Sequence, residues 1–409
     1  MCLQMPVCLS IDHVCQRIFP AWLEPLRRAL TKLLISALFL AAVNRLTAAE
    51  RFFPLKDVHP GLHGIGRTVF EGNRIEEFQV EILGVLENVG PKQAIILAKL
   101  SGGPLERAGV LQGMSGSPVY IDGKLAGAIA LGFPFSKEPL AGIQPIEQMI
   151  ADADFSPPSG GALDISHNAT FWGKPAIIPA PLSFDFPSGN LTEILTPVAL
   201  SGFTPGTLQL FSSYFRRLGF QPQQGVSAGS PKSQQYSGTV VPGSMISVQL
   251  MTGDLSVSAE GTVTFVDGKR VYAFGHRFLE SGSTELPFAR AEVIALLPAL
   301  NTSFKISTPR EWVGTILSDR NTSIAGEIGR EAHLLPVTIS VRSPVMGTHE
   351  YHMQVVNNRL LTPFLTQTAI FSAIDATERT LGPGTLRLRG SVQFLSLIHI
   401  SEPTRQAEI

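Results

Sequence analysis

The sequence predicts a mainly β protein with a few short helices. The chain has 38 glycines and 30 prolines, a composition that favours many short strands and turns over long helices. Apolar residues alternate with polar ones, or run together for a few positions, in segments such as 76–87, 93–101 and 244–253, as strands do. Two Asp-Gly pairs, at 122–123 and 267–268, lie between apolar runs and predict tight hairpins.

Length, composition and charge narrow the class of protein. With 409 residues, 44% hydrophobic and 16% charged, the chain is long enough for two or three domains and able to bury a large core. The formal net charge is only −1, whereas a nucleic-acid-binding protein normally carries a basic excess. We therefore expect a folded protein with no nucleic-acid partner.

The first 49 residues predict a leader with a signal peptide. A basic patch precedes an apolar run at 33–43, and small residues suited to cleavage follow near Ala48 or Ala49. The run is shorter than the roughly 20 residues of a membrane span. We expect a secreted, periplasmic or cell-envelope protein. An uncleaved signal anchor is the alternative, and it would be the only membrane contact.

Cysteine usage fits this interpretation of the leader. The three cysteines, Cys2, Cys8 and Cys15, all precede residue 16. The main body therefore has no disulfide framework, no Cys-ligated zinc site and no cysteine nucleophile.

The remainder divides into units by pattern. Residues 60–154 are predicted to form one β unit that closes with a short helix near 142–154, and residues 239–330 a second β unit. Between them, 155–238 is expected to be an irregular connection ending in a polar linker at 221–238.

The C-terminal part is expected to add strands and a helix over 331–394, with Phe364, Ile370, Phe371 and Ile374 as the helix's apolar face. Residues 395–409 resemble a stray adapter-encoded tail, so we expect them to be non-native. Inside the second unit, residues 285–300 are predicted to form a short core helix that carries Arg290 and Glu292 among apolar residues.

The segment Gly113–Pro118 (GMSGSP) carries the clearest chemical signal. A serine hydroxyl needs a base to take its proton and backbone donors to hold an oxyanion. Glycines beside Ser115 let the backbone adopt conformations that point its N–H groups at one spot. The same letters also suit a plain tight turn before a buried strand, so the motif alone leaves both interpretations open.

Two motifs resemble the stage IV sporulation protein B family of serine peptidases. Residues 76–129 end in GMSGSPVYIDGKLAGAI, similar to that family's nucleophile segment and the hairpin after it. Residues 261–276, GTVTFVDGKRVYAFGH, resemble the segment that carries the family's histidine, and 314–329 resembles the stretch after it. The resemblance covers about 60–150 and 240–330.

The resemblance implies two trypsin-like β-barrel units and a serine endopeptidase acting on a polypeptide. Ser115 would be the nucleophile, His276 the general base, and the amides of Gly113 and Ser115 the oxyanion hole. No cofactor and no metal are implied.

The order of the two halves departs from the family, because Ser115 here precedes His276. Triads are defined by geometry rather than by chain order, so the halves could pair within one chain as in a circular permutation. They could also pair between chains, or a missing C-terminal region could supply another serine half.

The acid member also departs from the family. The segment 99–106, where the family places its aspartate, contains none. Four acids lie near His276 in sequence without a motif to recommend them: Asp254, Asp267, Glu280 and Glu285. A Ser-His dyad and a loss of activity both remain open, and the acid member is left unassigned.

Other histidines and neighbours of His276 offer further alternatives. His59 and His63 could approach Ser115 as another base, but Pro60 and Gly61 between them argue against a helical zinc pair. Arg277 and Phe278 replace the small residues usual after the family's histidine and would narrow the cleft or alter specificity. The alternative to an enzyme is a catalytically inactive protease-like binding module or a structural envelope protein.

Overall fold

A computed structural model describes residues 51–155, 183–186, 189–225, 240–300, 302–343, 346–378, 387 and 389–391. The predicted leader with its three cysteines and the predicted tail at 395–409 lie outside these residues. Within them, the strands β1–β19 far outnumber the four helices α3–α6, which confirms the mainly β prediction. In this part of the chain, no helix is long and apolar enough to span a membrane.

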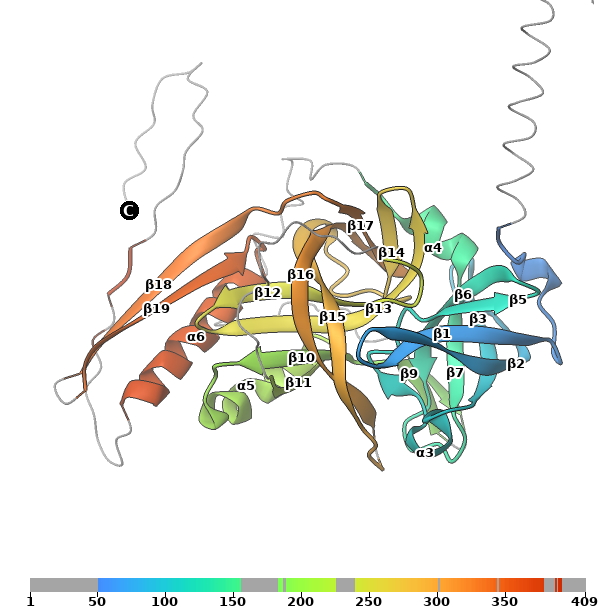
Figure 1. The fold of residues 1–409 in the computed structure, drawn as a ribbon, viewed down its shortest axis with the longest axis horizontal. Coiled ribbons are helices and arrows are strands. Elements are labelled where there is room, and N and C mark those ends of the chain that lie inside the picture. Colours follow the sequence, from blue (N-terminus) through green and yellow to red (C-terminus); the bar gives the residue numbers. More distant parts are fainter. Residues whose placement is uncertain are drawn as a thin grey trace, which may run out of the picture.

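The first unit is a closed antiparallel barrel of six strands (Figure 1). Its strand order is β5-β1-β2-β3-β7-β6, and β5 pairs with β6 to close the ring. Its elements are η2 (Leu55–Asp57), β1 (His63–Glu71), β2 (Arg74–Gly90), β3 (Gln93–Ser101), α3 (Leu105–Ala108), β4 (Leu111–Gln112), β5 (Pro118–Ile121), β6 (Lys124–Gly132), β7 (Leu140–Pro145) and α4 (Ile146–Asp152). Asp122 and Gly123 both have positive φ at the β5–β6 turn, which confirms the first Asp-Gly hairpin.

The connection between the two units contains regular structure. It comprises β8 (Ser183–Phe186), β9 (Gly189–Glu193), β10 (Thr196–Ser201), α5 (Pro205–Arg217) and β11 (Phe220–Gln224). β9 pairs with β6 of the first unit, and β10 pairs with β13 of the second. The chain therefore crosses from one sheet to the other between Glu193 and Thr196. Residues 221–224, at the start of the predicted polar linker, belong to β11, which pairs in parallel with β10.

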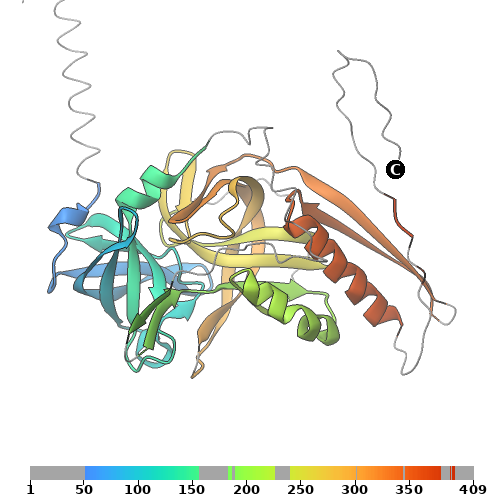
Figure 2. The ribbon, with the colours of Figure 1, turned by 180° about the vertical axis from the view of Figure 1, so that it is seen from behind.

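Six strands of the second unit also pair in a closed antiparallel ring. The order is β13-β14-β17-β16-β15-β12, and β12 pairs back to β13. Their bounds are β12 (Met245–Gly253), β13 (Ser256–Asp267), β14 (Arg270–Ala273), β15 (Gly282–Leu297), β16 (Ser303–Arg320) and β17 (Ser323–Ile328). The two rings lie side by side in both views (Figures 1 and 2).

The helix expected at 285–300 is wrong, because Gly282–Leu297 forms strand β15. Arg290 and Glu292 are paired across the sheet rather than along a helix. Arg290 donates to Glu311, and Glu292 accepts from Arg310, both on neighbouring β16. Bulges near Ala289 and Ala291 interrupt the alternation, which is why the sequence lacked a clear two-residue period.

The C-terminal hairpin and helix cover the outer part of the second sheet. β18 (Leu334–Ser343) and β19 (Gly347–Val356) extend the sheet beyond β12, and α6 (Leu361–Thr377) packs beside α5, as Figure 2 shows from behind. The Phe364 ring lies 4.8 Å from that of Phe215 on α5. The predicted apolar face is only partly right: Phe364 is buried, but Phe371 is 38% exposed. Small residues such as Ala369 and Ala373 fill the buried face instead.

Candidate active site

Ser115 lies on a tight turn between β4 and β5, as its glycines predict. Gly113 and Gly116 have φ of +88° and +92°, the left-handed region that glycine adopts without strain. The Ser117 amide donates to the Met114 carbonyl (2.9 Å), and the Gly116 amide donates to the Ile129 carbonyl on β6 (2.7 Å). These bonds fix the turn, and the Ser115 side chain is fully buried in it.

The predicted oxyanion hole belongs to this same turn. The amides of Met114, Gly116 and Ser117 all donate to protein carbonyls. The other two amides of the turn are those of Gly113 and Ser115, the pair assigned to the oxyanion. Their role stays a prediction.

His276 follows β14 after two residues with positive φ, Phe274 (+70°) and Gly275 (+71°). Its Nδ1 lies 2.7 Å from the Arg277 carbonyl oxygen. A carbonyl only accepts, so Nδ1 carries the proton and the Nε2 lone pair is the acceptor. Burial lowers the pKa of His276 to about 4; the Arg277 carbonyl opposes this shift, and the Arg277 charge adds to it. The imidazole is therefore neutral at physiological pH.

The serine turn is docked on β13 of the histidine unit. The hydroxyls of Thr262 and Thr264 donate to the carbonyls of Gly113 and Gly116, each over 2.8 Å, and the Thr262 amide donates to the Ser115 carbonyl over 2.9 Å. These bonds join the turn to the strand that leads into the β14 hairpin and His276.

Gly275 and Gly116 converge on the same carbonyl group. A side-chain carbon added at Gly275 would lie 3.1 Å from the Ile129 oxygen, which already accepts from Gly116. The residue after Ser115 and the residue before His276 thus meet at one point on β6. The serine turn and the histidine segment are thus in contact within a single chain.

Three side-chain polar atoms at this junction are buried without a hydrogen-bond partner in the described part of the protein. They are the Ser115 Oγ, the Ser117 Oγ and the His276 Nε2. The serine and histidine atoms are not hydrogen-bonded to each other in this conformation. Leaving a buried polar atom unsatisfied costs about 1–3 kcal/mol, so such atoms call for a functional explanation.

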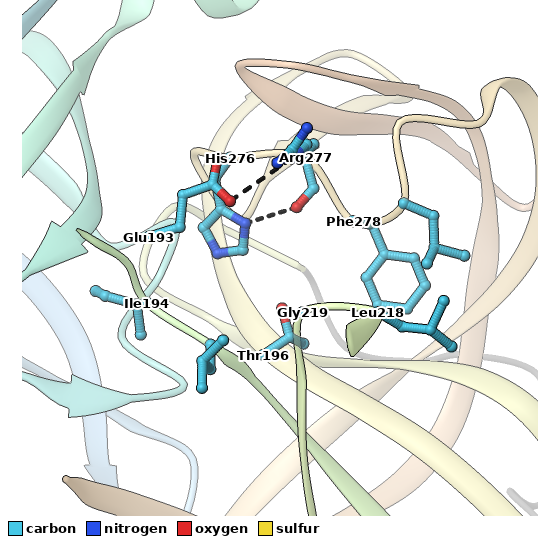
Figure 3. A pocket seen from close by; sticks show the side chains of 10 residues that line it. Glu193, Ile194, Thr196, Leu218, Gly219, His276, Arg277 and Phe278 are labelled. Carbon is cyan, nitrogen blue, oxygen red and sulfur yellow. Dashed lines mark hydrogen bonds and ion pairs between the residues drawn. The ribbon is translucent and has the colours of Figure 1, made fainter. Parts of the chain in front are cut away.

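A small pocket opens beside His276 (Figure 3). Its volume is ≈ 20 Å³, room for roughly one water molecule. The Glu193–Thr196 crossing and the Leu218–Gly219 turn form one side, and His276–Leu279 the other. Arg277 lines it, with Nε 3.6 Å from Glu193 and a terminal nitrogen 2.7 Å from Glu280.

The two residues after His276 lie in different surroundings, one at the pocket and the other in the core. Arg277 lies at the pocket with only 11% of its side chain exposed, while Phe278 is buried against Phe220, with ring centroids 4.8 Å apart. Arg277 and its partner Glu193 therefore both line the pocket; a narrowing of the cleft by Arg277 stays a prediction. Sequence reasoning missed Glu193, because it lies in a segment without a motif.

Asp319, at the end of β16, is a second residue that sequence reasoning missed. Its carboxylate is fully buried and accepts from the amides of Phe278 (2.8 Å), Leu279 (2.9 Å) and Ser281 (3.0 Å), and from the Ser281 hydroxyl (2.7 Å). All of these donors belong to the loop after His276. The signal in the sequence was an aspartate within an apolar strand pattern.

The alternative histidines lie elsewhere. His59 and His63 are exposed, and the His59 ring bonds to the neighbouring Pro60 carbonyl. Among the described residues, no three His, Cys, Asp or Glu side chains gather as metal ligands.

A serine on a glycine-containing turn at the junction of two six-strand rings is a feature that two-barrel serine peptidases also have. Residues 51–150, which include Ser115, match the family model described as SpoIVB peptidase S55. This match confirms the resemblance of the serine unit. No curated protein and no solved structure matches the chain.

Proposed function

We propose that this protein is an extracytoplasmic serine endopeptidase that hydrolyses peptide bonds through Ser115 and His276. The observation that carries the proposal is the pair of buried, unpartnered atoms, Ser115 Oγ and His276 Nε2, on segments that meet at the Ile129 carbonyl. The apolar run at 33–43 supports export. Sequencing the mature N-terminus in the exported fraction would check it.

The chemistry follows from the tautomer of the imidazole. Ser115 Oγ attacks the scissile carbonyl carbon while its proton passes to the His276 Nε2. Collapse of the tetrahedral intermediate breaks the C–N bond, and the same proton goes to the leaving amine. Water then attacks the acyl-ester carbon while His276 Nε2 takes its proton; the C–O bond to Ser115 breaks, the acid product leaves, and the proton returns from His276 to Ser115 Oγ.

Burial of both groups defines what else the reaction needs. Ser115 is fully buried and His276 is 5% exposed, and the pocket borders His276 but not Ser115, so a substrate reaches both only after the structure around them opens. The Glu193–Thr196 crossing beside His276 is the segment whose displacement would widen the pocket. If the site stays closed, the fold acts instead as a protease-like binding module.

Labelling with a fluorophosphonate tests the proposal. We expect wild-type protein to be labelled on Ser115 and the Ser115→Ala variant not to be labelled. Ser117→Ala is the matched control, because Ser117 Oγ is also buried and unpartnered two residues away; we expect its labelling rate to stay within about twofold of wild type. Labelling of folded Ser115→Ala at the wild-type rate, or none of folded wild type, would refute the proposal.

The pH dependence of labelling reports the base. Since burial lowers the pKa of His276 to about 4, the imidazole accepts a proton at every pH above that value and is itself protonated below it. We expect the labelling rate to rise with pH along a limb whose apparent pKa lies below 6.5. A limb at 6.5 or above, in protein shown by circular dichroism to be folded throughout, would contradict this.

A further inference from the structure

The loop after His276 contains a continuous chain of hydrogen bonds that ends at a carboxylate. His276 Nδ1 donates to the Arg277 carbonyl oxygen, and the Phe278 amide donates to Asp319 Oδ1. The Arg277 carbonyl and the Phe278 N–H belong to one peptide group. A single peptide unit therefore separates the imidazole from the buried carboxylate.

We propose that Asp319 is the positioning residue of His276 and acts through the peptide group between Arg277 and Phe278. This inference rests on the proposed function. In a serine-protease triad the acid holds the histidine's tautomer and stabilises the imidazolium by direct contact. Here Asp319 performs the same two tasks through a peptide group. It would thus take the place of the acid in a chain whose 99–106 segment has no aspartate.

We call the chain of bonds from Asp319 through the Arg277–Phe278 peptide group to His276 the relay. Charge and hydrogen-bond cooperativity explain how it would act. A hydrogen bond from an amide to a carboxylate is stronger than a neutral one. It polarises the amide, which makes the carbonyl oxygen at the other end of the same group a better acceptor. A better acceptor at the Arg277 oxygen keeps the proton on Nδ1 and stabilises positive charge on the ring as Nε2 takes the serine proton.

The remaining bonds of Asp319 hold the geometry of the relay. Its Oδ2 accepts from the amides of Leu279 and Ser281 and from the Ser281 hydroxyl. With four donors and no exposed surface, the carboxylate fixes the loop that carries the Arg277 carbonyl. The charge that acts on the ring is that of the Arg277 guanidinium, which pairs with Glu193 and Glu280.

The four acids near His276 in sequence have other partners or roles. Glu280 pairs with Arg277 at the pocket. The others bond to segments elsewhere in the molecule: Asp254 to the His352 amide, Asp267 to Arg51 and Glu285 to His333.

The test compares Asp319→Asn with Asp319→Glu by two readouts. The first is the rate of fluorophosphonate labelling of Ser115 per folded molecule, as a function of pH. The second is the ¹⁵N spectrum of the His276 ring, assigned by its loss in His276→Gln, which reports the tautomer without any activity. Asp154→Asn is the control. It removes a carboxylate that pairs with Arg320, the residue after Asp319, and leaves the bonds between Asp319 and the loop after His276 in place.

We expect Asp319→Asn to label about 10- to 100-fold more slowly, a smaller loss than the ~10⁴-fold that follows removal of a directly bonded acid. The acidic limb of the variant's labelling-rate profile should move to lower pH. The ¹⁵N spectrum of its His276 ring should show a mixture of tautomers. Asp319→Glu should keep the Nδ1–H tautomer and recover part of the rate, and it serves as the informative variant if Asp319→Asn does not fold. Asp154→Asn should match wild type.

An Asp319→Asn protein with the wild-type tautomer, rate and limb would overturn the inference. So would a slower rate with an unchanged limb and tautomer, which indicates a merely structural role. If Ser115 never labels but the tautomer still follows Asp319, the proposed function fails while the relay stands.

Discussion

Replacing Gly116 with alanine is expected to lower the free energy of unfolding by about 4 kcal/mol or more and to abolish labelling of Ser115. A side-chain carbon at this position would lie 2.0 Å from the Thr262 oxygen and 2.5 Å from the Phe274 nitrogen. Both are backbone atoms, and the Phe274 amide itself donates to the Thr262 carbonyl over 3.2 Å just beyond the β13–β14 pairing, so neither moves without disturbing that end of the hairpin. The φ of +92° adds the strain of a left-handed conformation.

Gly123→Ala is the matched control for this substitution. Gly123 has a φ of +73°, and an added carbon there meets nothing within 4 Å. The Gly123→Ala substitution should therefore lower the free energy of unfolding only by the conformational term of about 1–2 kcal/mol. Urea unfolding of the two variants, followed by circular dichroism, isolates the contribution of close packing. Equal stability of the two would mean that the serine turn is not docked on β13.

The contact at Gly116 explains how the site is assembled. The serine and histidine units each close their own ring of strands, and β4 of the serine unit also pairs in parallel with β16 of the histidine unit. They are joined at the serine turn by the Thr262 and Thr264 bonds and by the close approach of Gly116 to Phe274. Loss of this contact should separate Ser115 from His276 even where both barrels remain folded.

The sequence predicted the parts of the fold that local patterns determine. The β5–β6 hairpin followed from its Asp-Gly pair, and the serine turn from its two glycines. The short helix near 142–154 is α4, Ile146–Asp152. Each of these depends on residues within a few positions of one another, which is the range over which backbone preferences act.

Features that depend on distant partners were not predictable in this way. Arg290 and Glu292 suit a strand because Glu311 and Arg310 face them from β16. Asp319 reaches the loop after His276 only because β15 and β16 pair at Gly282 and Asp319. An acid chosen by closeness to His276 in sequence was bound to miss it, since the fold supplies it from about 40 residues away.

A lysine, Lys305, is buried at the junction of the two units. Lys305 on β16 is fully buried, and its Nζ donates to the Thr68 hydroxyl on β1 over 2.7 Å. Among the described residues, no carboxylate lies within ion-pair distance of it. Burial lowers the pKa of Lys305 to about 7, because the charged form loses its hydration without gaining an anion.

Lys305→Met is therefore expected to stabilise the protein at pH 7.5 by about 2–4 kcal/mol, net of the lost Thr68 bond. Between pH 7 and 10.5 the unfolded lysine binds a proton that the folded one lacks. Unfolding thus takes up a proton, so the free energy of unfolding of the wild type rises with pH across this window and decreases as pH falls toward 7.

The Lys305→Met variant should lack that slope, while Lys137→Met, at an exposed position, should keep it. Urea unfolding at pH 7.5, 8.5 and 9.5 measures both effects, and equal slopes in wild type and Lys305→Met would show that Lys305 stays charged in the folded protein. The slopes of Glu260 and His276 do not interfere, because their pKa values of about 6 and about 4 place their titration below this window.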